Sequence, residues 1–540
     1  IEQHLSGVGR AVPAAADERR AWPALRLAFA IPDHPWVDSA DGAAVRVAMT
    51  VGAAGDGAGR LVTVEEELDT GGDDAVAVRH AERSGTTHAD LTVGADVASA
   101  RPLGANRGIA FTGMYPLGQG FVLLPDELSQ AVGTDINTSA VVKPFVISRD
   151  LTQQSRRARV IDFYPRSAEE ARSEFSCLFQ WVIDRVKPER DQNPVEERRR
   201  NWWLFTRPIP DLRSAIAPLA RYIAVPRTAK WFSFQFVLPD TVPDTSVVAV
   251  ASDDAFVLGV LSSQLHLRWA LRTGGTLEDR PRYQHNQTFN PFPFPAATPD
   301  QQSRIRELAE QLDAHRKRQQ AAHPALTLTG MYNVLEKLKA GEPLTAKDKT
   351  IHEQGLVAVL KSLHYELDRA VLGAYGWGEL APLLEIANGN ARPESAGQGS
   401  RDAAIRALDA ALLDRLVALN AERAAEEARG LVRWLRPEFQ NPQAAPRQEA
   451  MAVEGETAAA ALTPGPSPGG RGEKLPWPAA LPEQVAAVAR LLAESPVPLD
   501  ADAIAARYTG RGPWKKRLPQ LLDTLVALGR ARHGPNGYTA

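Results

Sequence analysis

The sequence predicts a multidomain chain that combines α/β and α+β architecture. Its 540 residues are too many for one hydrophobic core, so three or four domains are expected. Strand-like runs dominate up to residue 295, apolar side chains then recur at helical spacing, and a Pro/Gly-rich stretch precedes a short last segment. We therefore expect four domains and a linker, with the boundaries 1–130, 131–295, 296–436, 437–475 (the linker) and 476–540.

Composition excludes several classes of protein. The net charge of −3 gives no global attraction to nucleic acid, so any such attraction must be local. Cys177 is the only cysteine, which excludes a disulfide scaffold and a cysteine-based zinc site and fits a reducing cytoplasm. No apolar run is long enough to span a bilayer, and no signal peptide is present. We expect a cytoplasmic protein with no membrane partner and no metal site.

Region 1–130 begins with β-type runs at Leu25–Ile31 and Val45–Val51. The glycines of Gly55–Gly59 (GDGAG) lead into another such run, Leu61–Glu67. Because GDGAG stands between two strands, it predicts a hairpin turn and not a phosphate-cradling loop. The chain opens at Ile1 and reaches its first strand quickly, so we expect its start to be a truncation inside a domain.

Regions 131–295 and 296–436 differ in periodicity. The first is mixed. Its helix-like run is Ala168–Arg185, and its four strand-like runs are Val141–Ile147, Ala158–Phe163, Phe232–Val237 and Val247–Ala251. The second is helical. Thr298 and Pro299 form a cap and a first-turn proline, and apolar residues then recur on one face, as at Ile305, Leu308, Ala309 and Leu312.

The C-terminal region follows a linker that cannot bury a core, because Leu462–Glu473 reads LTPGPSPGGRGE. Residues 476–540 then show three helical patterns and a tight turn at Asn536-Gly537, a pattern typical of a winged helix. Basic residues cluster between Arg507 and Arg532. Such units dock on DNA or on protein partners, and the pattern favours DNA.

A basic segment, Arg185–Lys230, carries eleven basic and five acidic residues in a chain that is net negative. Trp202, Trp203, Tyr222 and Trp231 are interleaved with them. Basic residues mixed with aromatic ones suit a nucleic-acid surface. The alternative is a solvated basic face with Trp202 and Trp203 packed beneath it.

The stretch Glu278–Pro295 (EDRPRYQHNQTFNPFPFP) is the most informative in the chain. Glu278, Arg280 and Arg282 alternate, so an extended backbone would turn all three to one side. An acid with two guanidiniums can read base edges in a major groove. Aromatic residues and prolines then alternate up to Pro295, and this stiff seam excludes a helix or a central strand. We expect it to close a domain. His266, just upstream, is expected to be a core histidine because no second ligand stands at helical spacing.

At these residues the chain resembles the C-terminal part of MmeI-like adenine-specific DNA methyltransferases of the type IIL/IIG restriction–modification kind. Ala30–Gly52 looks like the distal end of their Rossmann-like methyltransferase domain, and 1–130 would be this end with its connector. The segments that resemble the target-recognition domain are Val186–Asn193, Arg199–Phe205, Arg221–Lys230, Leu258–Leu271 and Phe289–Pro295. Leu326–Leu338 and Leu419–Gln440 resemble the helical region that follows.

The resemblance implies that the intact enzyme flips an adenine in double-stranded DNA and methylates its N6 with S-adenosylmethionine, in restriction–modification or phage defence. This chain would choose the sequence. The family's cofactor loop and Asn-Pro-Pro-Tyr/Phe motif belong upstream of Ala30–Gly52, so we expect no catalytic residue and no bound cofactor here. Asn290-Pro291-Phe292 lacks the second proline and is interpreted as structural. The alternative is a non-enzymatic DNA-binding specificity subunit that acts with a separate catalytic or defence-system chain.

The resemblance also assigns roles to single residues. An acid-x-Arg-x-Arg run before the aromatic–proline ladder contributes to base reading in that family, and Glu278, Arg280 and Arg282 match it. The arginines would donate to guanine O6 and N7, and Glu278 would accept from a cytosine amino group. The residues expected to contact the DNA backbone are Arg198, Arg199, Arg200, Arg207 and Lys230.

Overall fold

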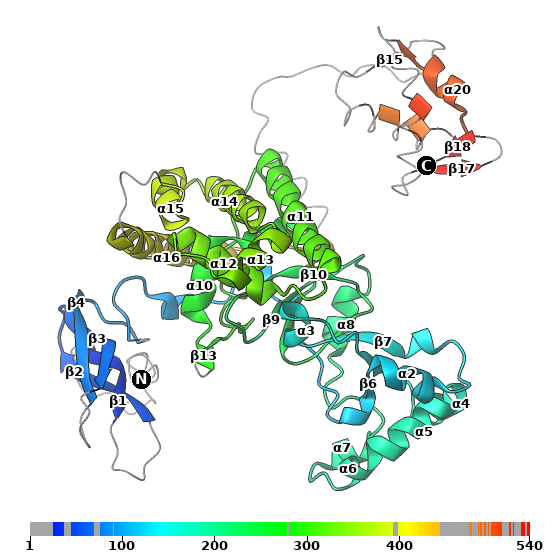
Figure 1. The fold of residues 1–540 in the computed structure, drawn as a ribbon, viewed down its shortest axis with the longest axis horizontal. Helices are drawn as coiled ribbons and strands as arrows, with labels where there is room; N and C mark the ends of the chain where they lie inside the picture. The colour runs from blue at the N-terminus through cyan, green and yellow to red at the C-terminus, as the bar shows by residue number, and fades with distance from the viewer. Residues whose placement is uncertain are drawn as a thin grey trace. The chain divides into compact units, whose positions relative to one another are not determined.

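The computed structural model describes residues 25–36, 45–69, 76–89, 91–277, 280–391 and 398–442, with short segments between 475 and 539. The chain divides into two compact units, Ile1–Ala450 (unit 1) and Met451–Ala540 (unit 2). The mixed α/β character expected from the sequence is confirmed, since sheets and helices both recur along the chain (Figure 1). The finer boundaries at 130, 295 and 436 stay predictions.

The first sheet has the strand order β2-β1-β3-β4. Its strands are β1 (Leu25–Trp36), β2 (Val45–Ala54), β3 (Gly59–Asp69) and β4 (Val76–Gly85). The runs predicted at the first three strands are confirmed, but the hairpin predicted through GDGAG is wrong. β1 lies between β2 and β3 and runs parallel to β3, with Ala30 opposite Leu61, and both side chains are buried. Burial of this pair, which the local turn residues do not encode, decides the strand order.

Two further sheets form the middle of unit 1. One has the order β10-β9-β12-β5, all antiparallel, with β5 (Ala110–Thr112), β9 (Tyr222–Pro226), β10 (Gln235–Val237) and β12 (Val247–Val250). The other has the order β11-β7-β8-β6, with β6 (Val122–Leu123), β7 (Val142–Val146), β8 (Arg159–Ile161) and β11 (Val242–Pro243). Every residue of β9 and β12 is buried, which is why they read as continuous apolar runs. The four strand predictions for this region are confirmed within a few residues.

Short helices surround these sheets. They are α2 (Pro125–Val132), α3 (Ser148–Thr152), α4 (Ala168–Glu174), α5 (Ser176–Arg185), α6 (Lys187–Asp191), α7 (Glu196–Arg200) and α8 (Pro210–Ile216). The helix predicted over 168–185 is interrupted at Phe175, where φ is −137°. Figure 1 shows α2 and α4–α7 gathered with β6 and β7 in one lobe.

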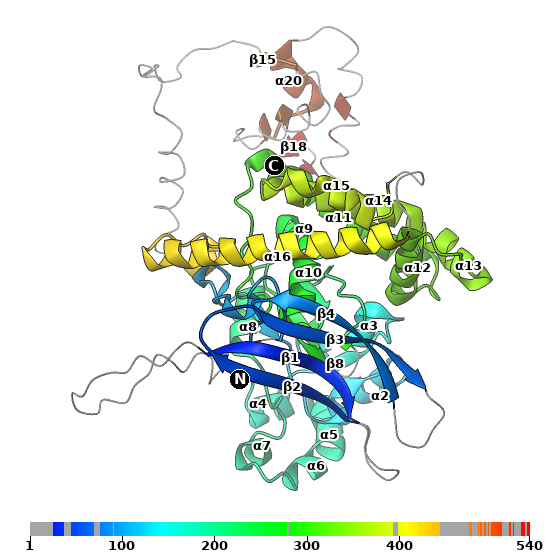
Figure 2. The same ribbon diagram turned by 90° about the vertical axis from the view of Figure 1, so that its left-hand side faces the viewer.

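Longer helices complete unit 1. They are α9 (Ala255–Ser262), α10 (Gln264–Thr273), α11 (Pro299–Ala322), α12 (Leu328–Ala340), α13 (Ala346–Gly355), α14 (Val357–Ala374), α15 (Ala381–Ala387) and α16 (Gln398–Ala428). Thr298 caps α11 by accepting from the Gln301 N–H, as predicted. Gly259 lets α9 lie against α11, because a Cβ there would come within 2.6 Å of Ile305. One hydrophobic core runs from Val97 to Leu416, and α16 crosses the unit beside α15 (Figure 2).

Unit 2 has its own small core, built from Val488, Leu492, Ile504, Leu518 and Leu522. The helix α20 (Ala501–Ala506) and the hairpin of β17 (Arg532–Gly534) with β18 (Gly537–Thr539) are described, and this confirms the predicted hairpin. Most of the predicted basic cluster lies outside the described residues, as do residues 443–474 of the linker. The described start of the predicted linker contains the short helix α17 (Pro437–Gln440). Among the helices that are described, none has both the length and the apolar character that a membrane crossing needs.

Candidate nucleic-acid interface

The predicted base-reading residues lie on a hairpin that follows α10. β13 (Thr276–Leu277) pairs with β14 (Arg280–Pro281) in antiparallel register, and the hairpin extends from the end of α10 (Figure 1). Arg280 is exposed on β14, and Arg282 follows it, half-buried. Glu278 lies outside the described residues. That the charged side chains of this segment face one side stays a prediction.

Glycine sets the position of this hairpin. α10 ends at Gly274, where any side chain would collide with the carbonyl oxygen of Arg282, and Gly275 has φ +70°. The Arg282 N–H donates to the Gly275 carbonyl at 3.1 Å. Arg282 also forms an isolated antiparallel bridge with Thr228, just beyond β9. The hairpin is thus fixed to the end of a buried strand.

This bridge brings three arginines together from distant segments: Arg207, Arg227 and Arg282, here called the arginine triad. Burial, followed by the like charges of Arg282 and Arg207, lowers the pKa of Arg227. Both charged groups that contribute to this shift of the pKa are cationic. Arg207 is held by main-chain hydrogen bonds with Tyr115 in both directions, at 3.0 and 3.2 Å. Positive charge concentrated in this way is a site for an anion.

His285 borders the arginine triad as a neutral group. Burial and then the charge of Arg227 lower its pKa, so the imidazole is uncharged at neutral pH. Its Nδ1 lies 3.4 Å from the Thr112 hydroxyl on β5. His285 therefore adds no positive charge beside Arg227 at neutral pH.

The predicted backbone contacts are not all near the triad. Arg207 belongs to it. Arg198, Arg199 and Arg200 lie on α7, at the end of the lobe and apart from β13 (Figure 1). Arg200 pairs with Glu196 at 2.7 Å, and Arg199 donates to the Asn193 carbonyl at 2.6 Å. Lys230 is exposed, with its ammonium 5.3 Å from the Trp231 ring centre.

Several other cations of the basic segment have structural roles. Arg190 is fully buried and donates to the carbonyl oxygens of Pro116, Leu117 and Leu204 at 2.6–3.2 Å. Arg213 pairs with Asp162 at 2.6 Å. The local excess of positive charge therefore overstates the basic surface, because part of it satisfies buried acceptors.

The interleaved aromatic side chains belong to the core. Trp202 and Trp203 pack against it, and the Trp203 indole donates to the Arg166 carbonyl at 3.0 Å. Tyr222 is fully buried and its hydroxyl donates to the Thr241 carbonyl at 2.8 Å. The packed arrangement, which the sequence left as the alternative for Trp202 and Trp203, is the one observed, and Tyr222 is buried as well.

His266 and Asn290-Pro291-Phe292 are structural, as predicted. His266 is buried, its Nε2 is 2.9 Å from the Tyr283 hydroxyl, and burial lowers its pKa to about 3. Phe292 is also buried. The Asn106 side-chain amide donates to the Phe292 carbonyl at 2.7 Å, and that of Asn420 donates to the Pro291 carbonyl at 2.6 Å. The seam ties two distant segments to the core.

Arg227 is the site residue that sequence reasoning missed. In the sequence it is one of the eleven basic residues of the basic segment, and nothing local distinguishes it from Arg221 or Lys230. Its distinction is contact with the segment around Arg282, which lies far along the chain, and a one-dimensional pattern does not report such a contact.

The fold and this site define the class of the central domain. Residues 97–296 match the family model described as MmeI, target recognition domain. This match confirms the resemblance to the MmeI target-recognition domain that was drawn from the sequence.

A solved structure supports the same fold. The chain is similar to the type IIL restriction–modification enzyme MmeI in complex with DNA, with a TM-score of 0.50 and 18% sequence identity. The similarity covers 74% of this chain and 46% of that one, so the chain spans less than half of that enzyme's length. No curated protein matches the sequence.

Proposed function

We propose that this chain is the sequence-recognition part of a site-specific DNA adenine-N6 methyltransferase of a restriction–modification or phage-defence system. The observation that carries the proposal is the arginine triad on the face of a domain that matches the MmeI target-recognition model. Guanidiniums gathered in this way suit the anionic backbone and guanine edges of a duplex.

Within this interface the residues divide by role. Arg280 and Arg282 would read guanine O6 and N7, with Glu278 accepting from a cytosine amino group. Arg207 and Arg227 would contact phosphates, and Lys230 and the α7 arginines Arg198, Arg199 and Arg200 would extend the backbone contacts. The hairpin, anchored at Gly274 and Thr228, would present these side chains to a major groove.

The remaining parts would serve the intact enzyme. The sheet β1–β4 would be the distal end of a Rossmann-like methyltransferase domain, and the cofactor-binding part of such a domain would hold S-adenosylmethionine. Unit 2 would be a winged-helix-like module that adds a second contact to DNA. The same interface would serve if methylation came from a separate catalytic chain.

Replacing Arg282 with alanine is expected to relax preference at one base position by about 10- to 100-fold, because a bidentate arginine–guanine pair contributes about 1–3 kcal/mol of discrimination. The intact chain first selects duplexes from a random pool, and the variant is then titrated on the selected site and on its single-base variants. Arg304→Ala, an exposed arginine of α11, is the matched control. Equal losses on selected and scrambled duplexes would overturn the base-reading role.

Arg227→Ala is expected to act differently. It should weaken binding to all duplexes alike and make the slope of log affinity against log salt shallower by about one, because one phosphate contact is lost. Titrations at three salt concentrations on selected and scrambled duplexes measure both quantities. An unchanged salt slope would exclude Arg227 from the phosphate contacts.

A further inference from the structure

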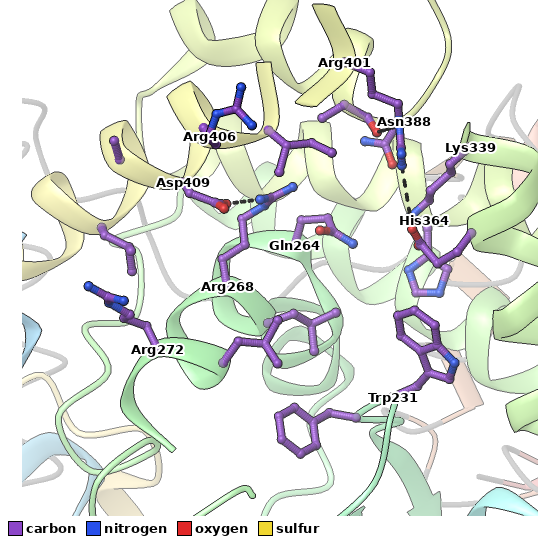
Figure 3. Close-up of a pocket in the computed structure, with 18 of the residues that line it drawn as sticks. Trp231, Gln264, Arg268, Arg272, Lys339, His364, Asn388, Arg401, Arg406 and Asp409 are labelled. Atoms are coloured by element: carbon purple, nitrogen blue, oxygen red, sulfur yellow. Dashed lines mark hydrogen bonds and ion pairs between the residues drawn. The ribbon is translucent and has the colours of Figure 1, made fainter. Parts of the chain in front are cut away.

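A cavity of about 540 Å³ lies between α10, α12, α14 and α16, bordered by Trp231 beyond β9 (Figure 3). Its size is that of a small-molecule site. None of the triad arginines lines it, although Lys230, one of the proposed backbone contacts, does. The segment Lys230–Phe232 borders the cavity. The residue before it, Ala229, donates its N–H to the Pro281 carbonyl of β14 at 3.3 Å.

The lining of this cavity is strongly cationic. Two acidic side chains, Glu336 and Asp409, face seven cationic ones: Arg83, Lys230, Arg268, Arg272, Lys339, Arg401 and Arg406. Both acids are already engaged. Asp409 pairs with Arg268, while Glu336 pairs with Lys339 at 3.1 Å and Arg401 at 3.7 Å. Most of the positive charge is therefore not balanced from within the lining, which favours an anionic ligand.

The two deepest cations each pair with one acid of the lining, but the Arg268 guanidinium keeps an N–H for a further acceptor. The side chains of Lys339 and Arg268 are only 5% and 13% exposed. The buried Nε–H of Arg268 has no hydrogen-bond partner among the described residues. Burial lowers the pKa of Arg268 to about 10, so it still carries its charge at neutral pH. Charges held in a low-dielectric site interact with an opposite charge far more strongly than in water.

The lining also includes apolar side chains, among them Trp231, Leu267, Leu335 and Ile405. The Trp231 ring is held in place because its indole donates to the Asn333 side chain at 3.0 Å. Figure 3 shows Gln264 and Asn388, whose amides can bond polar edges of a heterocycle, on the side toward Arg268 and Arg401. The cavity thus offers a planar apolar surface, amides and a group of cations.

We propose that this cavity binds a free nucleoside phosphate. The phosphates lie against Arg268, Arg401 and Arg406, and the base packs on Trp231. S-Adenosylmethionine does not fit this lining, because its sulfonium gives it a net positive charge. A cavity of about 540 Å³ suits a mononucleotide better than a duplex, whose phosphates bind along extended surfaces.

The test is calorimetric titration of the full chain with ATP, AMP, adenosine, tripolyphosphate and S-adenosylmethionine, without DNA. We expect saturable binding of one ATP per chain, weaker binding of AMP, and none of adenosine or S-adenosylmethionine. Arg406→Glu, an exposed lining residue, should weaken ATP at least about tenfold. Arg318→Glu, an exposed arginine of α11 outside the lining, should leave it unchanged.

A second variant separates the base from the phosphates. Trp231→Leu should weaken ATP at least about fivefold and leave tripolyphosphate unchanged, because only the aromatic face is lost. Absence of saturable ATP binding at millimolar concentration would overturn the proposal, as would equal ATP affinity of Arg406→Glu and the unmodified chain. If Arg406→Glu weakened DNA while ATP failed to bind, the cavity would belong to the DNA interface and the proposal would also fail. DNA selection by the chain is measured separately, so the two proposals stand or fall independently.

Discussion

Asn420→Ala is expected to destabilise unit 1 by about 3–5 kcal/mol, because it leaves three main-chain groups without partners in a buried position. The Asn420 side chain is 1% exposed. Its Oδ1 accepts from the Arg101 N–H at 2.9 Å, and its Nδ2 donates to the carbonyls of Arg101 at 2.8 Å and Pro291 at 2.6 Å. A single amide therefore joins α16 to the start of the recognition domain and to its closing seam.

Urea unfolding followed by tryptophan fluorescence measures this loss. Asn286→Ala removes an exposed asparagine and should change the free energy of unfolding by less than about 0.5 kcal/mol. Asn420→Asp keeps the acceptor but loses both donated bonds, so it should also be strongly destabilising. A cost below about 1 kcal/mol for Asn420→Ala would show that α16 is not held through this amide.

Asp368→Asn is expected to stabilise the protein at alkaline pH and to flatten its pH dependence. Asp368 is fully buried on α14, and burial raises its pKa from 3.8 to about 7. The Gln264 N–H and the charges of Lys339 and Arg268 oppose that rise. Because the folded state holds a proton that the unfolded state releases, this contribution to stability is full below about pH 4. As the pH rises through about 7, the protein loses this contribution to its free energy of unfolding, which is about 4 kcal/mol at most.

The measurement is the free energy of unfolding of both proteins at several pH values between 5 and 8.5. The gain of the asparagine variant over the aspartate should grow with pH across this range. Asp402→Asn on α16 replaces an exposed aspartate and should give a difference that does not grow with pH. A constant difference between Asp368→Asn and the unmodified chain would mean that Asp368 does not titrate in this window.

Local signals predicted most of the secondary structure. The β-branched runs at Val45–Val51, Val141–Ile147 and Val247–Ala251 became strands, and Thr298 caps α11 as expected. Each of these depends on residues within one turn or one strand. The hairpin predicted at GDGAG was wrong because β3 pairs with β1 and not with β2. The residues of the turn do not encode this pairing.

The sequence by itself determined where most strands and the long helices lie, the resemblance of the central domain to the MmeI target-recognition domain, and that Asn290-Pro291-Phe292 is a seam. Only the tertiary structure decided which cations meet. Arg190 and Arg213 satisfy buried acceptors, while Arg227 joins Arg207 and Arg282 across the bridge at Thr228. The physical reason is that helix and strand preferences act between near neighbours along the chain. The environment of a charge depends on which distant segments the fold packs against it.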